Sequence, residues 1–122
     1  MKAAILLIAH GSRHAPANED LHHVATMLRN RGHPIVVASF LELAEPGIED
    51  GGRDCVRQGA TAVVMSPYFL SAGVHVRRDL TESRDRLATE FPTVTFTLAE
   101  PLGRHSALID VVEQRVAEAT LI

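Results

Sequence analysis

Four apolar runs alternate along the chain with four stretches in which apolar residues recur at helical spacing. The apolar runs cover residues 3–9, 35–41, 62–70 and 94–99, and the helical stretches lie at residues 16–31, 48–59, 76–90 and 106–119. Strands that alternate with helices are typical of a parallel sheet with right-handed crossovers. The pattern therefore predicts an α/β fold with three layers, α/β/α, around a four-stranded parallel sheet of strand order 2-1-3-4.

The apolar runs differ from one another in a way that predicts the position of each strand. The first and third runs are apolar almost without interruption, as are strands covered on both faces. In the fourth run, Val94, Phe96 and Leu98 alternate with Thr95 and Thr97. This alternation indicates one buried and one wet face. We expect the first and third strands at the centre of the sheet and the fourth at an edge.

Two of the helical stretches have features that bear on packing. Gly51 and Gly52 lie inside the second stretch, where each glycine costs about 1 kcal/mol relative to alanine. The sequence offers no reason for this pair. The last stretch has an apolar face, formed by Leu108, Val112, Val116 and Ala119.

Composition limits the class of protein further. The 122 residues suit one domain over residues 1–122, and 46% of them are hydrophobic with a formal net charge of −3. This charge argues against nucleic-acid binding, which favours a basic surface. Cys55 is the only cysteine, so neither an intrachain disulfide nor a cysteine metal cluster is expected. The first apolar run is too short to span a bilayer and has no cleavage pattern, so we expect a cytoplasmic protein without a membrane partner.

A polar segment that can carry chemistry follows each predicted strand. The first segment contains His10, the second Glu42 and Glu45, the third His75, and the fourth Arg104 and His105. Because parallel strands end at the same edge of a sheet, and ligands bind at that edge, we expect these segments to meet. Two imidazoles and one carboxylate with open positions suit Fe, Co, Ni or Zn rather than Ca or Mg. The sequence therefore predicts that two imidazoles and one carboxylate from these segments meet in a metal site.

Each of these residues also has a structural interpretation. A lone histidine after a strand more often stabilises a turn, and Glu42 is also compatible with a solvated loop. The Arg77-Arg78 pair is typical of a solvated helix face. The same structural interpretation is favoured for His14, His22, His23 and His33, whereas His105 is intermediate because it lies at the expected edge. Neither a P-loop nor a dinucleotide-binding fingerprint is found.

Taken together and in order, the polar segments resemble the short form of the CbiX-type sirohydrochlorin chelatases. The matching segments are residues 9–13 (AHGSR), 40–46 (FLELAEP), 58–60 (QGA), 67–70 (PYFL), 72–79 (AGVHVRRD) and 101–103 (PLG). The resemblance covers essentially the whole chain. It implies a chelatase-like half-lobe, because the short members resemble half of a two-lobed chelatase, and hence a homodimer.

The resemblance also implies an activity and roles for residues. The activity is insertion of a divalent metal, cobalt first and iron or nickel as alternatives, into sirohydrochlorin, a tetrapyrrole with acetate and propionate groups. His10 and His75 would be the catalytic, metal-binding pair and Glu42 their carboxylate partner, with no organic cofactor. The arginines at these segments are candidates for pairing with substrate carboxylates; they are Arg13, Arg77, Arg78 and Arg104.

Two other functions remain open from the sequence. A carrier that binds metal or tetrapyrrole without catalysing their union would use the same residues. A hydrolase with a metal-activated water is the third possibility.

Overall fold

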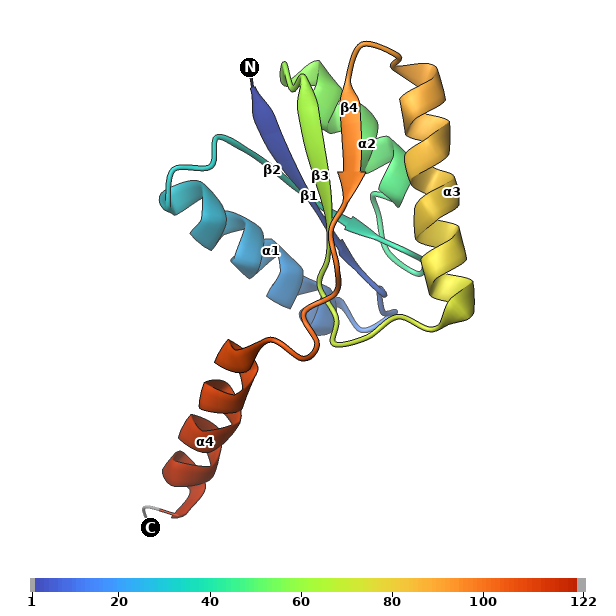
Figure 1. Cartoon of the computed structure of the whole chain (residues 1–122). Coiled ribbons are helices and arrows are strands. Elements are labelled where there is room, and N and C mark those ends of the chain that lie inside the picture. Colours follow the sequence, from blue (N-terminus) through green and yellow to red (C-terminus); the bar gives the residue numbers. More distant parts are fainter. Residues whose placement is uncertain (1, 121–122) are drawn as a thin grey trace.

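A parallel four-stranded sheet forms the centre of the computed structural model, which describes residues 2–120 (Figure 1). The strand order is β2-β1-β3-β4, as the sequence predicts. Positions 1, 121 and 122 of the expected domain lie outside the described residues. The elements are β1 (Ala3–Ala9), α1 (Ala15–Asn30), β2 (Ile35–Phe40), α2 (Ile48–Arg57), β3 (Ala62–Pro67), α3 (Val74–Glu90), β4 (Thr95–Leu98) and α4 (Ser106–Thr120).

Strand positions follow the hydrophobic pattern, although β3 is shorter than predicted. β1 and β3 are the central strands and β4 is an edge strand, which confirms the expectation from their sequences. β3 ends at Pro67 rather than at residue 70. The Tyr68 N–H still donates to the carbonyl of Ile8, but β1 ends one residue later, at Ala9. Beyond residue 68 the chain therefore has no residue of β1 left to pair with, and it leaves the sheet.

The two faces of the sheet carry separate cores. Leu6 and Ile8 of β1 pack with residues of α2 and α3, such as Cys55 and Leu87. Leu7, the residue between them, packs with α1 on the opposite face. This alternation follows from the two-residue period of a strand. Figure 1 shows α1 on one side of the sheet and α2 and α3 on the other, so the three predicted layers are present.

α4 does not join either layer. It projects away from the sheet (Figure 1), and none of its residues, 106–120, is buried. Its apolar face is largely in solvent, with Ile109, Val112 and Val116 exposed by 64%, 59% and 57%. α1 covers only the β2 and β1 side of its face of the sheet, and on β3 the outward Val64 is 40% exposed. Within residues 2–120, an apolar helix face and an uncovered strand face thus both lack a partner.

The paired glycines of α2 allow close packing on both sides of the helix. A Cβ on Gly51 would lie 2.9 Å from Leu6 Cδ1 and 3.0 Å from Ser39 Cβ. A Cβ on Gly52 would lie 2.6 Å from Leu87 Cδ1 of α3. The pair therefore allows α2 to approach the sheet and α3 closely, and this packing compensates for the low helix propensity of glycine.

No helix in residues 2–120 combines the length and the apolarity that a membrane crossing requires.

Gly52→Ala is expected to destabilise the protein although alanine favours a helix. The added methyl overlaps Leu87, and overpacking of a core costs about 1–3 kcal/mol, which outweighs a propensity gain of about 1 kcal/mol. Urea denaturation measures the free energy of unfolding. A Gly52→Ala variant as stable as the wild type would contradict this account of the packing.

Candidate active site at the carboxyl edge of the sheet

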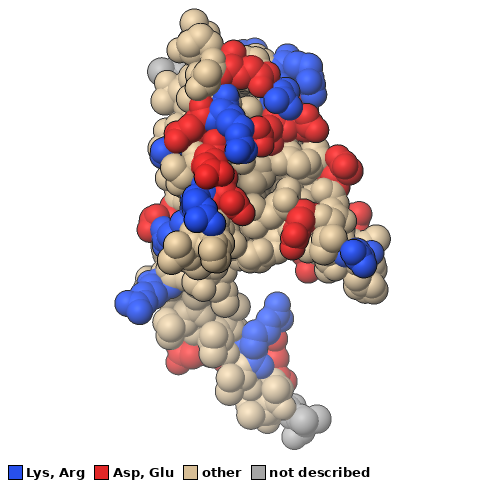
Figure 2. Space-filling view, turned by 90° about the vertical axis from the view of Figure 1, so that its right-hand side faces the viewer, with Lys and Arg blue, Asp and Glu red and all other residues tan. Residues whose placement is uncertain are grey.

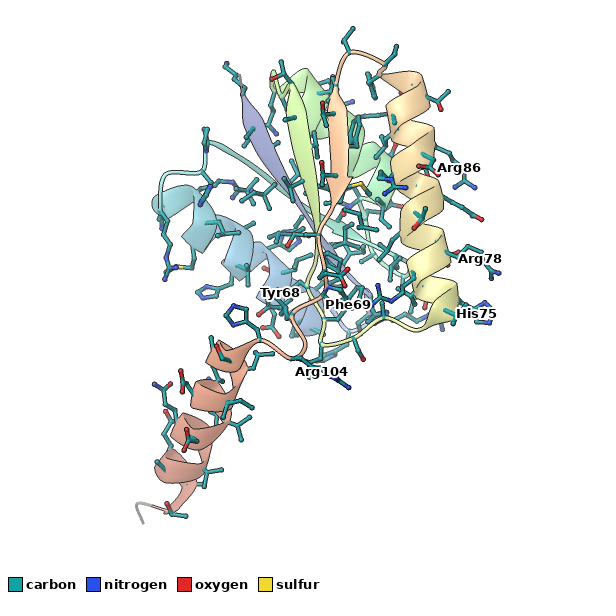
Figure 3. All side chains as sticks on the ribbon, viewed as in Figure 1. Tyr68, Phe69, His75, Arg78, Arg86 and Arg104 are labelled. Atoms are coloured by element: carbon teal, nitrogen blue, oxygen red, sulfur yellow. The ribbon has the colours of Figure 1, made fainter. Side chains whose placement is uncertain are left out.

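His10 lies directly after β1, at the carboxyl edge of the sheet. Its ring packs against Phe69, with ring centroids 4.6 Å apart and planes inclined by 32°. Phe69 follows β3 and lies below the sheet in the view of Figure 3. His10 is exposed as a residue, so its ring has an aromatic neighbour on one side and is not enclosed in the core.

Glu42 is tied to His10 through the backbone. The N–H of Glu42 donates to the carbonyl of His10 at 3.1 Å, and the Leu41 N–H donates to Ala9 at 2.9 Å. Gly11 has φ +93°, and a Cβ on it would lie 1.8 Å from the carbonyl oxygen of Glu42. Only glycine permits both this backbone conformation and this approach. The segment after β1 and the segment after β2 are therefore held together at Gly11.

His10 and Glu42 line one cavity of about 390 Å³ between the strand ends and α3. Its lining consists of His10, Leu41, Glu42, Ile48, Val76, Asp79, Glu82, Ser83 and Arg86. The cavity thus combines an imidazole and a carboxylate from the sheet edge with two further carboxylates from α3. This part of the predicted constellation is assembled within a single chain.

Sequence reasoning missed the residues that α3 contributes to this cavity. Asp79 and Glu82 lie on it beside Arg86, whose guanidinium lies 3.6 Å from the carboxylate of Glu82 and 3.6 Å from that of Glu49. The helical period of the sequence could have identified Asp79 and Arg86. They follow Val76 at intervals of three and ten residues, which places all three close to one face of a helix.

His75 does not line the cavity of His10 and Glu42. It is exposed in the first turn of α3, and its side chain points away from the sheet and from Phe69 (Figure 3). In residues 2–120, no three His, Cys, Asp or Glu side chains are close enough to hold one metal ion. The predicted convergence of His10, Glu42 and His75 is therefore absent from the single chain. The physical reason is helical geometry: Val76 takes the inward position, and its neighbour is rotated by about 100°.

The four candidate arginines lie on the segments that follow β1, β3 and β4, but they form no single cluster. Arg13 is exposed. Arg77 donates to the Ala72 carbonyl at 3.3 Å and lies 3.7 Å from a Glu100 oxygen. Arg78 Nη2 lies 2.6 Å from the Nδ1 of His75. Arg104 lies where the chain turns into α4 (Figure 3), within a cavity of about 610 Å³ lined only by residues of that turn and the start of α4.

The charges around the site are mixed in sign. Figure 2 shows acidic and basic side chains interleaved over the face of the molecule that it views, without one large patch of either sign. Cys55 is not available as a metal ligand, because burial raises the pKa of its thiol to about 12 and it lies in the core. The accessible ligand atoms at this edge are therefore imidazole nitrogens and carboxylate oxygens.

Comparison with known proteins gives a consistent result over nearly the whole chain. Sirohydrochlorin ferrochelatase of Arabidopsis thaliana, a chloroplast protein, is 40% identical over 92% of this chain and 50% of its own length. Sirohydrochlorin cobaltochelatase of Sulfolobus acidocaldarius is 28% identical over 94% of this chain and 90% of its own. The sirohydrochlorin chelatase SirB of Bacillus subtilis, solved with cobalt, superimposes with a TM-score of 0.88 at 33% identity, over 97% of this chain and 51% of that one.

The chain spans about half the length of several of the curated relatives it matches, among them the ferrochelatases. The sequence model of the CbiX family matches residues 4–119. The fold, the ordered polar segments and this match agree with the resemblance expected from the sequence, and the chain belongs to the CbiX family.

Proposed function

We propose that this chain inserts a divalent metal ion into sirohydrochlorin, with cobalt as the first metal and iron and nickel as alternatives. The observation that carries the proposal is the shared cavity of His10 and Glu42, at the ligand-binding edge of a CbiX-family fold. Relatives named for cobalt and for iron insertion both match nearly all of the chain. SirB structures with cobalt and with Fe3+ both match this chain, which supports testing cobalt and iron side by side.

The metal is proposed to be held by His10, Glu42 and His75 before its transfer. Imidazole and carboxylate ligands suit cobalt, iron and nickel, and three protein ligands leave room for an incoming nitrogen ligand. His10 and Glu42 already share a cavity. His75 would join them after its ring turns from the outer side of α3, since its backbone is adjacent to the cavity-lining Val76.

Metal insertion must also remove two pyrrole protons from the macrocycle. Imidazole titrates near neutral pH and is a suitable acceptor. One imidazole nitrogen cannot hold the metal and accept a proton at the same moment. We assign acceptance of one of these protons to His10 after the metal has left it, and the second proton passes to water.

The substrate's carboxylates are proposed to pair with Arg13, Arg77, Arg78 and Arg104. Guanidinium groups bind carboxylates through two parallel hydrogen bonds, which fix orientation as well as position. These arginines lie on exposed segments at the same end of the sheet as His10. A large anionic macrocycle is the kind of ligand that can reach several of them.

We also propose that the protein is a homodimer in which each copy places α4 on the uncovered face of β3 and β4 of the other. Val64 of β3 and the valines of α4 are exposed apolar surfaces without a partner in residues 2–120. Complete burial of a side chain of this size contributes about 1.5–3 kcal/mol. A reciprocal exchange covers both surfaces in both copies with one two-fold interface.

The length of the relatives supports this assembly. The chain covers 51% of SirB while almost all of the chain superimposes on it. Two copies would therefore supply about as much structure as one such relative. The cytoplasmic location, the absence of nucleic-acid and membrane partners and the absence of an organic cofactor stay predictions from the sequence.

His10→Ala and His75→Ala are each expected to lower the insertion rate by about 100-fold or more, because each removes a metal ligand or proton acceptor. The rate is measured from the absorbance of sirohydrochlorin after addition of Co(II), Fe(II) or Ni(II), against a protein-free reaction. His33→Ala is the control, because this exposed histidine lies in the turn after α1. Near-normal rates in either site variant would refute the assigned roles. Binding by the wild type without acceleration would select the carrier function instead.

Gly11→Ala is expected to lower the insertion rate by about 10- to 100-fold, because displacement by 1 Å has effects of this size. The new methyl must displace the Glu42 carbonyl and so separate Glu42 from His10. Gly32→Ala is the matched control: its φ of +101° is equally unfavourable, but a Cβ there meets nothing within 4 Å. Equal rates for the two variants would show that the contact between Gly11 and Glu42 does not matter.

Val112→Asp combined with Val116→Asp is expected to convert the dimer into a monomer, because each copy would bury two charges in the interface. Sedimentation velocity measures the mass. Gln114→Asp is the control, since residue 114 lies on the opposite side of α4. A wild-type protein that sediments as a monomer, or a double variant that remains dimeric, would exclude this assembly.

A further inference from the structure

The most specific contact at the start of α3 joins the two side chains that project there, His75 and Arg78. They are three residues apart and point in the same direction, away from the sheet (Figure 3). The Nη2 atom of Arg78 lies 2.6 Å from the Nδ1 atom of His75. The contact therefore accompanies the outward position of His75, the position in which it does not line the cavity of His10 and Glu42.

The chemistry of the two groups determines how the hydrogen atoms are placed. A guanidinium group only donates hydrogen bonds and stays protonated in proteins. Nδ1 of His75 must therefore accept, and a neutral imidazole that accepts at Nδ1 carries its hydrogen on Nε2. While this contact persists, neither nitrogen of His75 offers a free lone pair to a metal ion.

Among residues 2–120, Arg78 also differs from the other arginines on its helix because it forms no ion pair with an acidic side chain. Arg77 lies 3.7 Å from a carboxylate oxygen of Glu100, and Arg86 lies 3.6 Å from oxygens of both Glu49 and Glu82. Within residues 2–120, no carboxylate oxygen lies within 4.0 Å of the Arg78 guanidinium. A carboxylate makes a stronger, two-pronged contact with arginine than a neutral imidazole does. A carboxylate that approaches α3 can thus take Arg78 away from His75.

We propose that Arg78 is a positioning residue that blocks His75 until a carboxylate of the macrocycle binds Arg78 and releases the imidazole. The inference rests on the proposed function, because it takes His75 as a metal ligand and a carboxylated tetrapyrrole as the substrate. Once Arg78 has left, Nδ1 presents its lone pair and Nε2 keeps its hydrogen. Metal binding at Nδ1 then needs no proton transfer, only the exchange of one hydrogen bond for one metal–ligand bond.

This arrangement couples the two substrates of the insertion reaction. Without the macrocycle, the third ligand is held outside the cavity and the metal site is incomplete. Binding of the macrocycle to Arg78 releases His75 and so completes the metal site. Because the macrocycle favours the released state of His75, its binding shifts the population of molecules toward that state. The metal would be held most tightly when its acceptor is already present.

The experiment compares the metal-free wild type with Arg78→Met, which keeps the length of the side chain but removes its donors. At a pH of about 8, where most histidines are neutral, long-range ¹H–¹⁵N spectra report which ring nitrogen carries the hydrogen. We expect the Nε2–H form of His75 in the wild type and a mixture in Arg78→Met. Calorimetric titration with Co(II) alone is expected to show about five- to tenfold tighter binding to Arg78→Met, because the competing hydrogen bond is lost. With Co(II) saturating, the KM for sirohydrochlorin is expected to rise.

Two matched variants separate this role from a simple effect of charge. Arg77→Met removes the same charge one residue away but leaves the His75 ring contact in place, so its Co(II) affinity should stay within about twofold of the wild type. Arg78→Lys keeps a charged donor and should lie nearer the wild type than Arg78→Met in both the spectra and the titration. Tighter Co(II) binding combined with a higher KM is a pair of opposite changes that loss of a merely structural residue would not produce.

The inference is overturned if His75 has the same tautomer in Arg78→Met and the wild type, if Co(II) affinity does not change in Arg78→Met, or if Arg77→Met binds Co(II) as tightly as Arg78→Met does. These measurements use the metal alone and do not depend on catalysis. A wild type that shows the expected spectra and titrations but does not accelerate insertion would overturn the proposed function and leave the contact between Arg78 and His75 established.

Discussion

The site depends on one constraint, which is that β1 is hydrogen-bonded to a parallel neighbour on each side. β2 pairs with it over residues 4–9 and β3 over residues 3–8. Because all three strands run in the same direction, the segments that leave them emerge at a single edge. His10 and Glu42 are 32 residues apart in the chain and come together for this reason. The continuous apolar sequence of β1 is what makes a position between two strands and two helical layers favourable.

A second, local constraint converts proximity into a fixed arrangement. The Gly11 backbone approaches the Glu42 carbonyl so closely that no side chain fits between them. Phe69 packs against the His10 ring at the same place. An imidazole ring held in this way beside the fixed backbone of Glu42 needs little reorganisation to bind a ligand, which is the property a preorganised site requires. The acidic residues of α3 then give the cavity a second wall.

The outward parts of the molecule have a different character. α4 exposes an apolar face, and α3 exposes His75 and Arg78 in a pair with each other. Within residues 2–120 the apolar face of α4 has no covering surface, and His75, the proposed third metal ligand, lies outside the cavity of His10 and Glu42. We propose that a second copy covers the apolar face of α4 and that the macrocycle releases His75 from Arg78. Assembly of the full site would thus follow from association, whereas His10 and Glu42 are placed by folding alone.

The sequence by itself determined the layers, the strand order and the edge position of β4, because hydrophobic periodicity directly encodes which faces are buried. It also placed His10 and Glu42 at one edge, because parallel topology makes that consequence unavoidable. Only the tertiary structure decided which helical positions face inward, and so placed Asp79 on the cavity and His75 outside it. It alone explained Gly51 and Gly52, because the space that a side chain there would need is filled by Leu6 and Leu87. It alone showed that α4 does not pack on the sheet. An apolar stripe indicates that a helix face favours burial, but it does not indicate which surface covers that face.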